Sequence, residues 1–290
     1  MTRRQTFTLV KIGLWVAFVA LDALYHFNAD GERRPADAEP SSSGARAPES
    51  DRLRRPLPEL AATDSVVAVE SEPMHAGELL QGTAFSIDPR GVWVTARHVA
   101  SEGCGDLVMI LNGHRTEATL SALHPEWDVA VINTTEGSPA LPIETTRPAI
   151  GDTGYSFGFP SEKLGATQDI LMGRSRIVHT GRLVGTTPSL TWAETRRFPD
   201  TLESLGGMSG GPMFDETGRL AGILVAASER RGRVISVAPE LLRQVAREAG
   251  FPDATPAVAE VADRALPISD AARALARDSR IVKLYCRPRV

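Results

Sequence analysis

Residues 65–237 form a series of short apolar segments separated by turn residues, with no stretch that has the 3.6-residue periodicity of an amphipathic helix. Asp88-Pro89-Arg90-Gly91 and Asn112-Gly113 are typical turn sequences between antiparallel strands. Strands are expected at 65–69, 83–87, 92–95, 107–111, 129–132, 155–159, 170–172, 177–178, 220–226 and 234–237. This pattern predicts an all-β architecture for the region.

Helices are expected only after this region. Pro239 suits a first helical position, and Gly250 suits the residue past a helix end. A second helix is expected over 269–277, with Ser269 as its N-cap. Residues 281–286 then have the composition of a closing strand.

Composition excludes several classes of protein. The 290 residues carry a formal net charge of −4, which gives no reason to expect nucleic-acid binding. Two cysteines exclude a disulfide-dense scaffold and a CxxC metal site, and no metal or organic cofactor is implied. Cys104 and Cys286 either pair in an oxidising compartment or remain two buried thiols.

The first 29 residues have the pattern of a signal peptide or an uncleaved signal anchor. Arg3, Arg4 and Lys11 precede the apolar run 12–21, so the N-terminus is expected in the cytoplasm and the rest outside it. A buried helix of the fold is the alternative. Residues 30–62 are rich in proline, serine and charge, which predicts a disordered linker. A folded domain is expected over 63–250, followed by a C-terminal extension over 251–290.

Three motifs carry residues suited to acyl transfer. Ser209 lies in Gly207-Met208-Ser209-Gly210-Gly211-Pro212, His98 follows Thr95-Ala96-Arg97, and Asp128 precedes an apolar segment. A serine nucleophile needs a base, and an imidazole base needs a carboxylate to orient it. The alternatives are a serine in a glycine-rich loop, a histidine at a strand end and an aspartate that caps a strand. The five other histidines, His179 included, are interpreted as incidental.

The order of these residues along the chain separates hydrolase folds. The GxSxG pattern at Ser209 also fits α/β-hydrolases, but that fold needs its histidine after the serine. His179 is the last histidine of the chain, so this option is excluded. A subtilisin-like use of Asp88 before His98 would need an α/β sheet, which the strand pattern does not support.

With these motifs the chain resembles the trypsin-like (chymotrypsin-fold) serine peptidases, and within them the bacterial HtrA/Deg-type envelope proteases. The resemblance rests on Gly82-Thr83-Ala84-Phe85, Gly158-Phe159-Pro160 and the three motifs above. It implies a protease domain over 63–250 made of two six-stranded antiparallel β-barrels, the first to about 150 and the second over 151–237. Such relatives often carry a PDZ domain after the protease, for which no room is expected here.

The resemblance also implies roles. His98 would be the base, Asp128 the orienting acid, and the amides of Gly207 and Ser209 the oxyanion hole. Met208 stands where zymogen-activated digestive enzymes have an aspartate that receives a new N-terminus, so that activation is not expected, and the order of the loop is left open. The primary pocket would be lined by Val225, Ala226 and Ala227, which favours a small or medium aliphatic side chain; Glu203 would instead favour a basic one.

The expected function is therefore a serine endopeptidase that hydrolyses envelope proteins through a His-Asp-Ser triad and an acyl-enzyme. It would be tethered to the inner membrane, on the periplasmic or extracytoplasmic side, and act on polypeptides; relatives suggest a homo-oligomer. One alternative is a catalytically weak or silent module of the same fold that binds or senses a ligand. Another is a non-proteolytic hydrolase.

Overall fold

Short segments of alternating burial fold here into strands that pair across tight turns. The computed structural model describes residues 65–71, 79–101, 104–143, 145–181, 184–250 and 267–288. The expected N-terminal segment 1–29 and linker 30–62 lie outside these residues. No helix in the described ranges is long and apolar enough to cross a membrane. Strands dominate, so the predicted all-β architecture is confirmed.

Six strands close into a barrel in the order β13-β2-β3-β6-β5-β4. They are β2 (Leu80–Asp88), β3 (Val92–Thr95), β4 (Cys104–Leu111), β5 (His114–Leu123), β6 (Ala130–Asn133) and β13 (Ile281–Pro288). The two expected hairpins join β2 to β3 and β4 to β5. The second turn needs positive φ at Asn112 (50°) and Gly113 (83°), which explains its Asn-Gly sequence.

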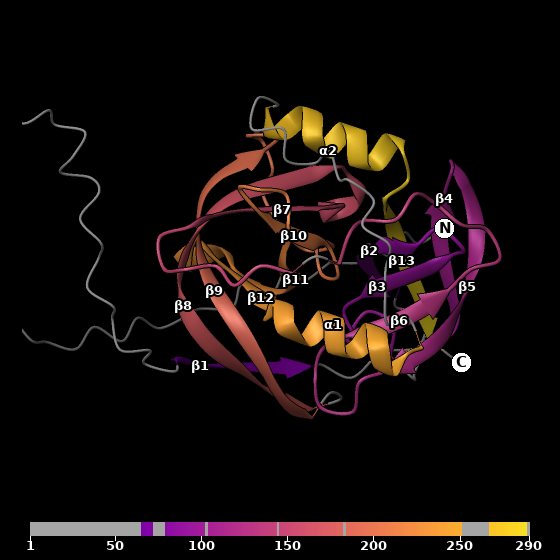
Figure 1. Cartoon of the computed structure of the whole chain (residues 1–290), viewed down its shortest axis with the longest axis horizontal. Coiled ribbons are helices and arrows are strands. Elements are labelled where there is room, and N and C mark those ends of the chain that lie inside the picture. Colours follow the sequence, from indigo (N-terminus) through magenta and orange to yellow (C-terminus); the bar gives the residue numbers. More distant parts are fainter. Residues whose placement is uncertain are drawn as a thin grey trace, which may run out of the picture. The chain divides into compact units, whose positions relative to one another are not determined.

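A second sheet has the order β1-β8-β7-β10-β11-β12-β9, and an additional pairing of β8 with β9 connects its last six strands in a ring. Its strands are β1 (Ser65–Ser71), β7 (Thr153–Gly158), β8 (Gly165–Gly181), β9 (Gly185–Phe198), β10 (Pro212–Asp215), β11 (Leu220–Ser228) and β12 (Arg233–Val237). In Figure 1, β8 and β9 are the two long neighbouring ribbons of this sheet.

The sequence predicted that the first barrel would end near residue 150 and the second would follow it. The structure differs from this prediction at two strands. The segment expected to open the first barrel, β1, pairs in parallel with the second half of β8 in the other sheet. The strand expected within a C-terminal extension, β13, lies in the first barrel between β2 and β4. The reason is the closure of the barrel: without β13, the facing edges of β2 and β4 would have no strand to pair with.

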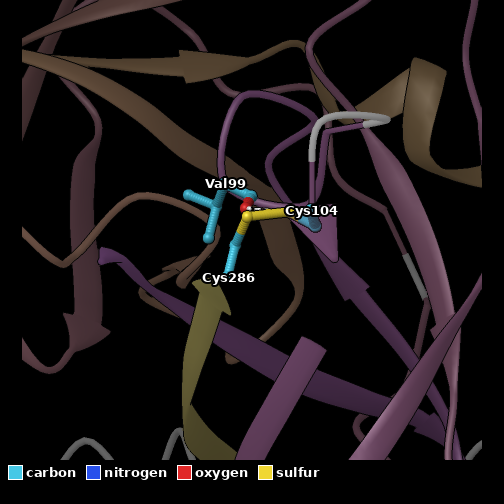
Figure 2. The surroundings of a disulfide bond; sticks show 3 residues. All are labelled: Val99, Cys104 and Cys286. Atoms are coloured by element: carbon cyan, nitrogen blue, oxygen red, sulfur yellow. Dashed lines mark hydrogen bonds between the residues drawn. A yellow bond between two sulfur atoms is a disulfide. The ribbon is translucent and has the colours of Figure 1, made fainter. Parts of the chain in front are cut away.

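A disulfide between Cys104 and Cys286 fixes β13 in this position (Figure 2). The two Cα atoms are 5.3 Å apart, and the bond joins residues 182 positions apart in the sequence. Of the two states that the sequence left open for these cysteines, the structure therefore has the paired one. The sulfur of Cys104 lies 3.7 Å from the carbonyl oxygen of Val99, so the bridge adjoins the turn that carries His98.

Both α-helices of the described residues span the two sheets. Helix α1 (Pro239–Glu248) packs against β11 of the second sheet and β6 of the first barrel, and α2 (Ile268–Arg277) packs against β7, β8 and β13. Pro239 is the first residue of α1, as predicted. The prediction that Ser269 caps α2 is wrong: the N-cap is Pro267, which has no side chain that can accept a hydrogen bond.

A fully buried acid, Asp169, lies on β8 of the second sheet. It accepts a hydrogen bond from the Thr167 hydroxyl at 2.7 Å through Oδ2. Its Oδ1 has no hydrogen-bond partner among the described residues. Burial, assisted by the charge of Glu194 and opposed by the Thr167 hydrogen bond, raises the pKa of Asp169 to about 8.

This acid gives a prediction about stability and pH. Between its ordinary pKa and about 8, the folded state binds more protons at Asp169 than the unfolded state, so the free energy of unfolding falls as pH rises. Asp169→Asn cannot ionise. The difference in unfolding free energy between variant and wild type should therefore increase with pH by about 1.4 kcal/mol per unit from pH 5 to 7, as measured by urea unfolding.

The exposed Asp200 provides the control, because Asp200→Asn removes a carboxylate outside the interior. Parallel stability curves for wild type and Asp169→Asn across this pH range would show that Asp169 is already ionised in the folded state.

Candidate active site

His98 and Asp128 meet because the strands that carry them are neighbours. His98 lies in the turn after β3, and Asp128 lies just before β6; these strands pair with Thr95 opposite Ala130. The end of one strand and the start of the other therefore lie at the same edge of the barrel. Asp128 Oδ2 is 2.7 Å from His98 Nδ1, and Asp128 Oδ1 accepts the backbone N–H of His98 at 2.9 Å.

The electrostatics favour an ionised Asp128 beside a partly accessible imidazole. Burial by itself would raise the pKa of Asp128, whose exposure is 1%. The charge and hydrogen bonds of His98, with a smaller contribution from His179, outweigh burial and hold this pKa below its usual value. The His98 side chain keeps 28% of its surface exposed, so a substrate can reach it.

A buried threonine of β2 holds the loop that contains Ser209. The Thr83 N–H donates to the carbonyl oxygen of Ser209 at 2.8 Å, and the Thr83 hydroxyl donates to that of Gly207 at 2.8 Å. The same hydroxyl accepts the N–H of Phe159 at 3.1 Å. A residue of the first barrel thus binds two carbonyls of a loop that leads into β10 of the second sheet.

The glycine after Ser209 lets this loop lie directly against the histidine turn. A Cβ on Gly210 would stand 2.1 Å from the Thr83 carbonyl oxygen and 2.9 Å from the Ala96 nitrogen, and its φ is +88°. Only glycine fits so close an approach at that φ. Because Ala96 begins the turn that contains His98, the structure brings the backbone of the Ser209 loop to the edge where His98 and Asp128 meet.

The amides of the loop fall into two groups. Those of Met208, Gly210 and Gly211 donate to carbonyl oxygens of the protein at 3.0, 2.7 and 2.8 Å. Those of Gly207 and Ser209 donate to no protein group within the described part of the chain. These two N–H groups are available to an oxygen atom of a ligand.

Met208 is held by packing. Its side chain is fully buried in an apolar cluster that includes Leu205, Trp192 and Met213, and its N–H bonds to the Leu205 carbonyl. A Cβ on Gly158 would lie 3.1 Å from the Met208 Cα, so β7 packs closely against this residue. An apolar side chain therefore orders the loop in the described structure, at a position that the sequence left open.

The residues considered for the primary pocket differ in burial. Val225 is buried, Ala226 is half-buried, and Ala227 is exposed, all on β11. Glu203 is exposed, whereas its neighbours Leu202 and Leu205 are buried. A different acid, Glu229, contacts the segment before Ser209: its carboxylate accepts the Leu205 N–H at 2.9 Å.

Sequence reasoning missed Thr83 as the residue that holds the Ser209 loop. Its only signal was its place in Gly82-Thr83-Ala84-Phe85, one of the motifs behind the resemblance. For metals, no cluster of three or more His, Cys, Asp or Glu side chains that could hold an ion occurs in the described ranges.

Comparison with known proteins finds similarity to serine peptidases. Residues 82–223 match the trypsin-like peptidase domain. The serine endoprotease DegS of Salmonella typhimurium is 34% identical over 146 residues, which are 49% of this chain and 38% of that protein. A probable periplasmic serine endoprotease of Brucella suis, DegP-like, is 27% identical over 176 residues, 59% of this chain and 32% of that protein.

The chain thus spans between about a third and two-fifths of the length of these relatives. Among solved structures, the active form of the Rv3671c protease from M. tuberculosis superposes with a TM-score of 0.51 at 21% identity. The match covers 62% of this chain and 77% of that one. This likeness shows a shared fold.

The Thr83 hydrogen bonds can be tested without reference to activity. Thr83→Val keeps the side-chain volume but leaves the Gly207 carbonyl and the Phe159 amide without their partner. We expect the free energy of unfolding to fall by about 1–3 kcal/mol. Hydrogen exchange of the Gly210 and Gly211 amides should also become faster.

Thr119→Val is the matched control, because the Thr119 hydroxyl makes only an exposed 3.4 Å contact. It should change stability by less than about 0.5 kcal/mol. Equal effects of the two substitutions would contradict the special position given to Thr83.

Proposed function

We propose that the chain is a trypsin-like serine endopeptidase of the bacterial HtrA-like kind, with His98, Asp128 and Ser209 as its catalytic triad. The match of residues 82–223 to the trypsin-like peptidase domain and the 34% identity to the serine endoprotease DegS support this proposal. The main support for the proposal is the 2.7 Å contact between His98 Nδ1 and Asp128 Oδ2. It lies at the barrel edge where Thr83 hydrogen-bonds the Ser209 loop. Asp128, buried and ionised, is suited to orient and stabilise a cationic imidazole.

The reaction follows from these positions. His98 takes the proton of the Ser209 hydroxyl as its oxygen attacks the peptide carbonyl carbon, and the amides of Gly207 and Ser209 bind the resulting oxyanion. When the C–N bond breaks, His98 gives the proton to the leaving amine and an acyl-enzyme remains. Water, deprotonated by His98, then hydrolyses the ester, and the proton returns to Ser209.

The free amides and the packing of Met208 support a loop that is ordered without an ion pair. In the described structure two amides of the loop point to no protein acceptor, and an apolar side chain fills the position before Ser209. Preorganised donors of this kind lower the barrier because they need no rearrangement during the reaction. This arrangement favours an active peptidase over a silent binding or sensor module.

For substrates and location, we propose that the chain acts on polypeptides in the periplasm or cell envelope, by analogy with its relatives, one of which is described as periplasmic. We retain the proposed N-terminal membrane segment over 1–29 and linker over 30–62, and assign β13 to the protease domain and not to a C-terminal extension. Membrane anchoring and assembly into a homo-oligomer are parts of this proposal.

Labelling with a fluorophosphonate probe tests the proposed function. Wild type should form a covalent adduct at Ser209, and Ser209→Ala should form none. Asp128→Asn should fold but react roughly 10⁴-fold more slowly, because the imidazole is then held in the wrong tautomer. Folded wild-type protein that neither labels nor cleaves an unfolded protein substrate would favour the silent module.

Labelling without cleavage of any peptide, combined with turnover of simple esters, would favour the non-proteolytic hydrolase. Circular dichroism of each variant shows whether a loss of labelling reflects chemistry or unfolding.

We further propose a preference for a small or medium aliphatic side chain before the scissile bond, with Val225, Ala226 and Ala227 as the pocket wall. The exposed Glu203 is then not a specificity residue. Glu203→Ala should leave the ratio of kcat/KM for peptides with Val or Ala to that for peptides with Lys or Arg within about twofold. Glu117→Ala, exposed on β5 of the first barrel, is the control.

A tenfold or greater selective loss on Lys and Arg peptides in Glu203→Ala would instead identify Glu203 as the determinant of a basic preference.

A further inference from the structure

The far end of the β8–β9 hairpin reaches across from the second sheet to the backbone of Asp128. The Thr187 hydroxyl oxygen on β9 accepts the N–H of Asp128 at 3.0 Å. The hairpin also touches the preceding turn, because a Cβ on Gly185 would stand 2.4 Å from the carbonyl oxygen of Glu126. Asp128 is therefore held by its own N–H as well as through both carboxylate oxygens.

A second hydrogen bond joins Thr187 to His179. Thr187 accepts the Asp128 N–H, and its hydroxyl keeps a proton and a second lone pair with which to bond His179 Nε2, which lies 3.1 Å away. Thr187 and His179 are both buried, at 0% and 3% exposure, so water does not compete for these bonds.

The charges around His179 are compatible with the neutral ring. Burial lowers the pKa of His179; the nearby Asp128 opposes this effect, and His98 and Arg97 add to it. A neutral imidazole has one nitrogen that donates and one that accepts, so either tautomer can bond the Thr187 hydroxyl.

We propose that Thr187 and His179 are positioning residues that hold Asp128 in the orientation from which it binds His98. The proposal deepens the proposed peptidase function and rests on it. The chain of hydrogen bonds runs from Asp128 N–H to Thr187 and on to His179, so a hairpin of the second sheet fixes the acid of the first barrel. Without it, the Asp128 N–H would be buried with no partner, and the turn would relax.

The first variant is Thr187→Val, which removes the acceptor for Asp128 N–H and keeps the volume of the side chain. We expect kcat to fall at least tenfold with KM within twofold, because the change affects the base and not the substrate contacts. The acid limb of the pH profile should move to lower pH, because a misplaced Asp128 stabilises the His98 cation less. Thr187→Ser should restore both values.

The adjacent Thr186→Val is the matched control, because Thr186 is exposed on the same strand; its kcat and pH profile should remain those of wild type. If Thr187→Val fails to fold, the pair His179→Leu and His179→Gln replaces it. His179→Leu removes the hydrogen-bond partner of the Thr187 hydroxyl and should lower kcat, whereas the side-chain amide of His179→Gln, which can donate or accept, should largely preserve it.

A spectroscopic readout separates this proposal from the peptidase function. The His98 Nδ1 proton shared with Asp128 should give a low-field NMR signal in wild type, and this signal should shift or disappear in Thr187→Val but not in Thr186→Val. If the signal shifts in Thr187→Val although the wild-type protein has no peptidase activity, the proposed peptidase function is refuted and the positioning role of Thr187 is supported. An unchanged signal and unchanged kcat in folded Thr187→Val would overturn the proposal.

Discussion

One fully buried side chain, Thr83, joins the two parts of the candidate site. Its backbone N–H and its hydroxyl take the carbonyl oxygens of Ser209 and Gly207, while its own carbonyl accepts the Thr95 hydroxyl at 2.8 Å. With these carbonyls bound on the barrel side, the amides of Gly207 and Ser209 remain free of protein partners in the described part of the chain. The position of the Ser209 loop relative to the His98 turn depends on this set of hydrogen bonds.

The first barrel must be rigid for Thr83 to act in this way, and the last strand of the chain completes it. β13 pairs with β2, the strand of Thr83, on one side and with β4 on the other. The disulfide fixes this strand beside the turn that carries His98, and α2 packs against β13 as well as β7 and β8. Residues distant in sequence thus support the edge where the site is built.

The candidate site residues were accessible to sequence reasoning because each stands in a short motif. His98 and Asp128 border the strands β3 and β6, and Ser209 stands among glycines that permit close approach. The turn at Asn112-Gly113 and the start of α1 at Pro239 were accessible for the same reason, since local backbone chemistry decides them. Strands β5, β9 and β10 were missed: β5 is largely exposed, and β9 carries threonines and arginines without a clear alternation.

The sequence by itself determined the all-β class, the order His98, Asp128, Ser209 and the resemblance to trypsin-like peptidases. These properties depend on neighbouring residues and on chain order. Only the tertiary structure decided that β1 joins the second sheet and that β13 closes the first barrel. It also decided that Thr83 hydrogen-bonds the Ser209 loop and that Thr187 hydrogen-bonds Asp128. Strand edges and buried N–H groups can take partners from any part of a chain, so their pairing is settled only when the whole chain has folded.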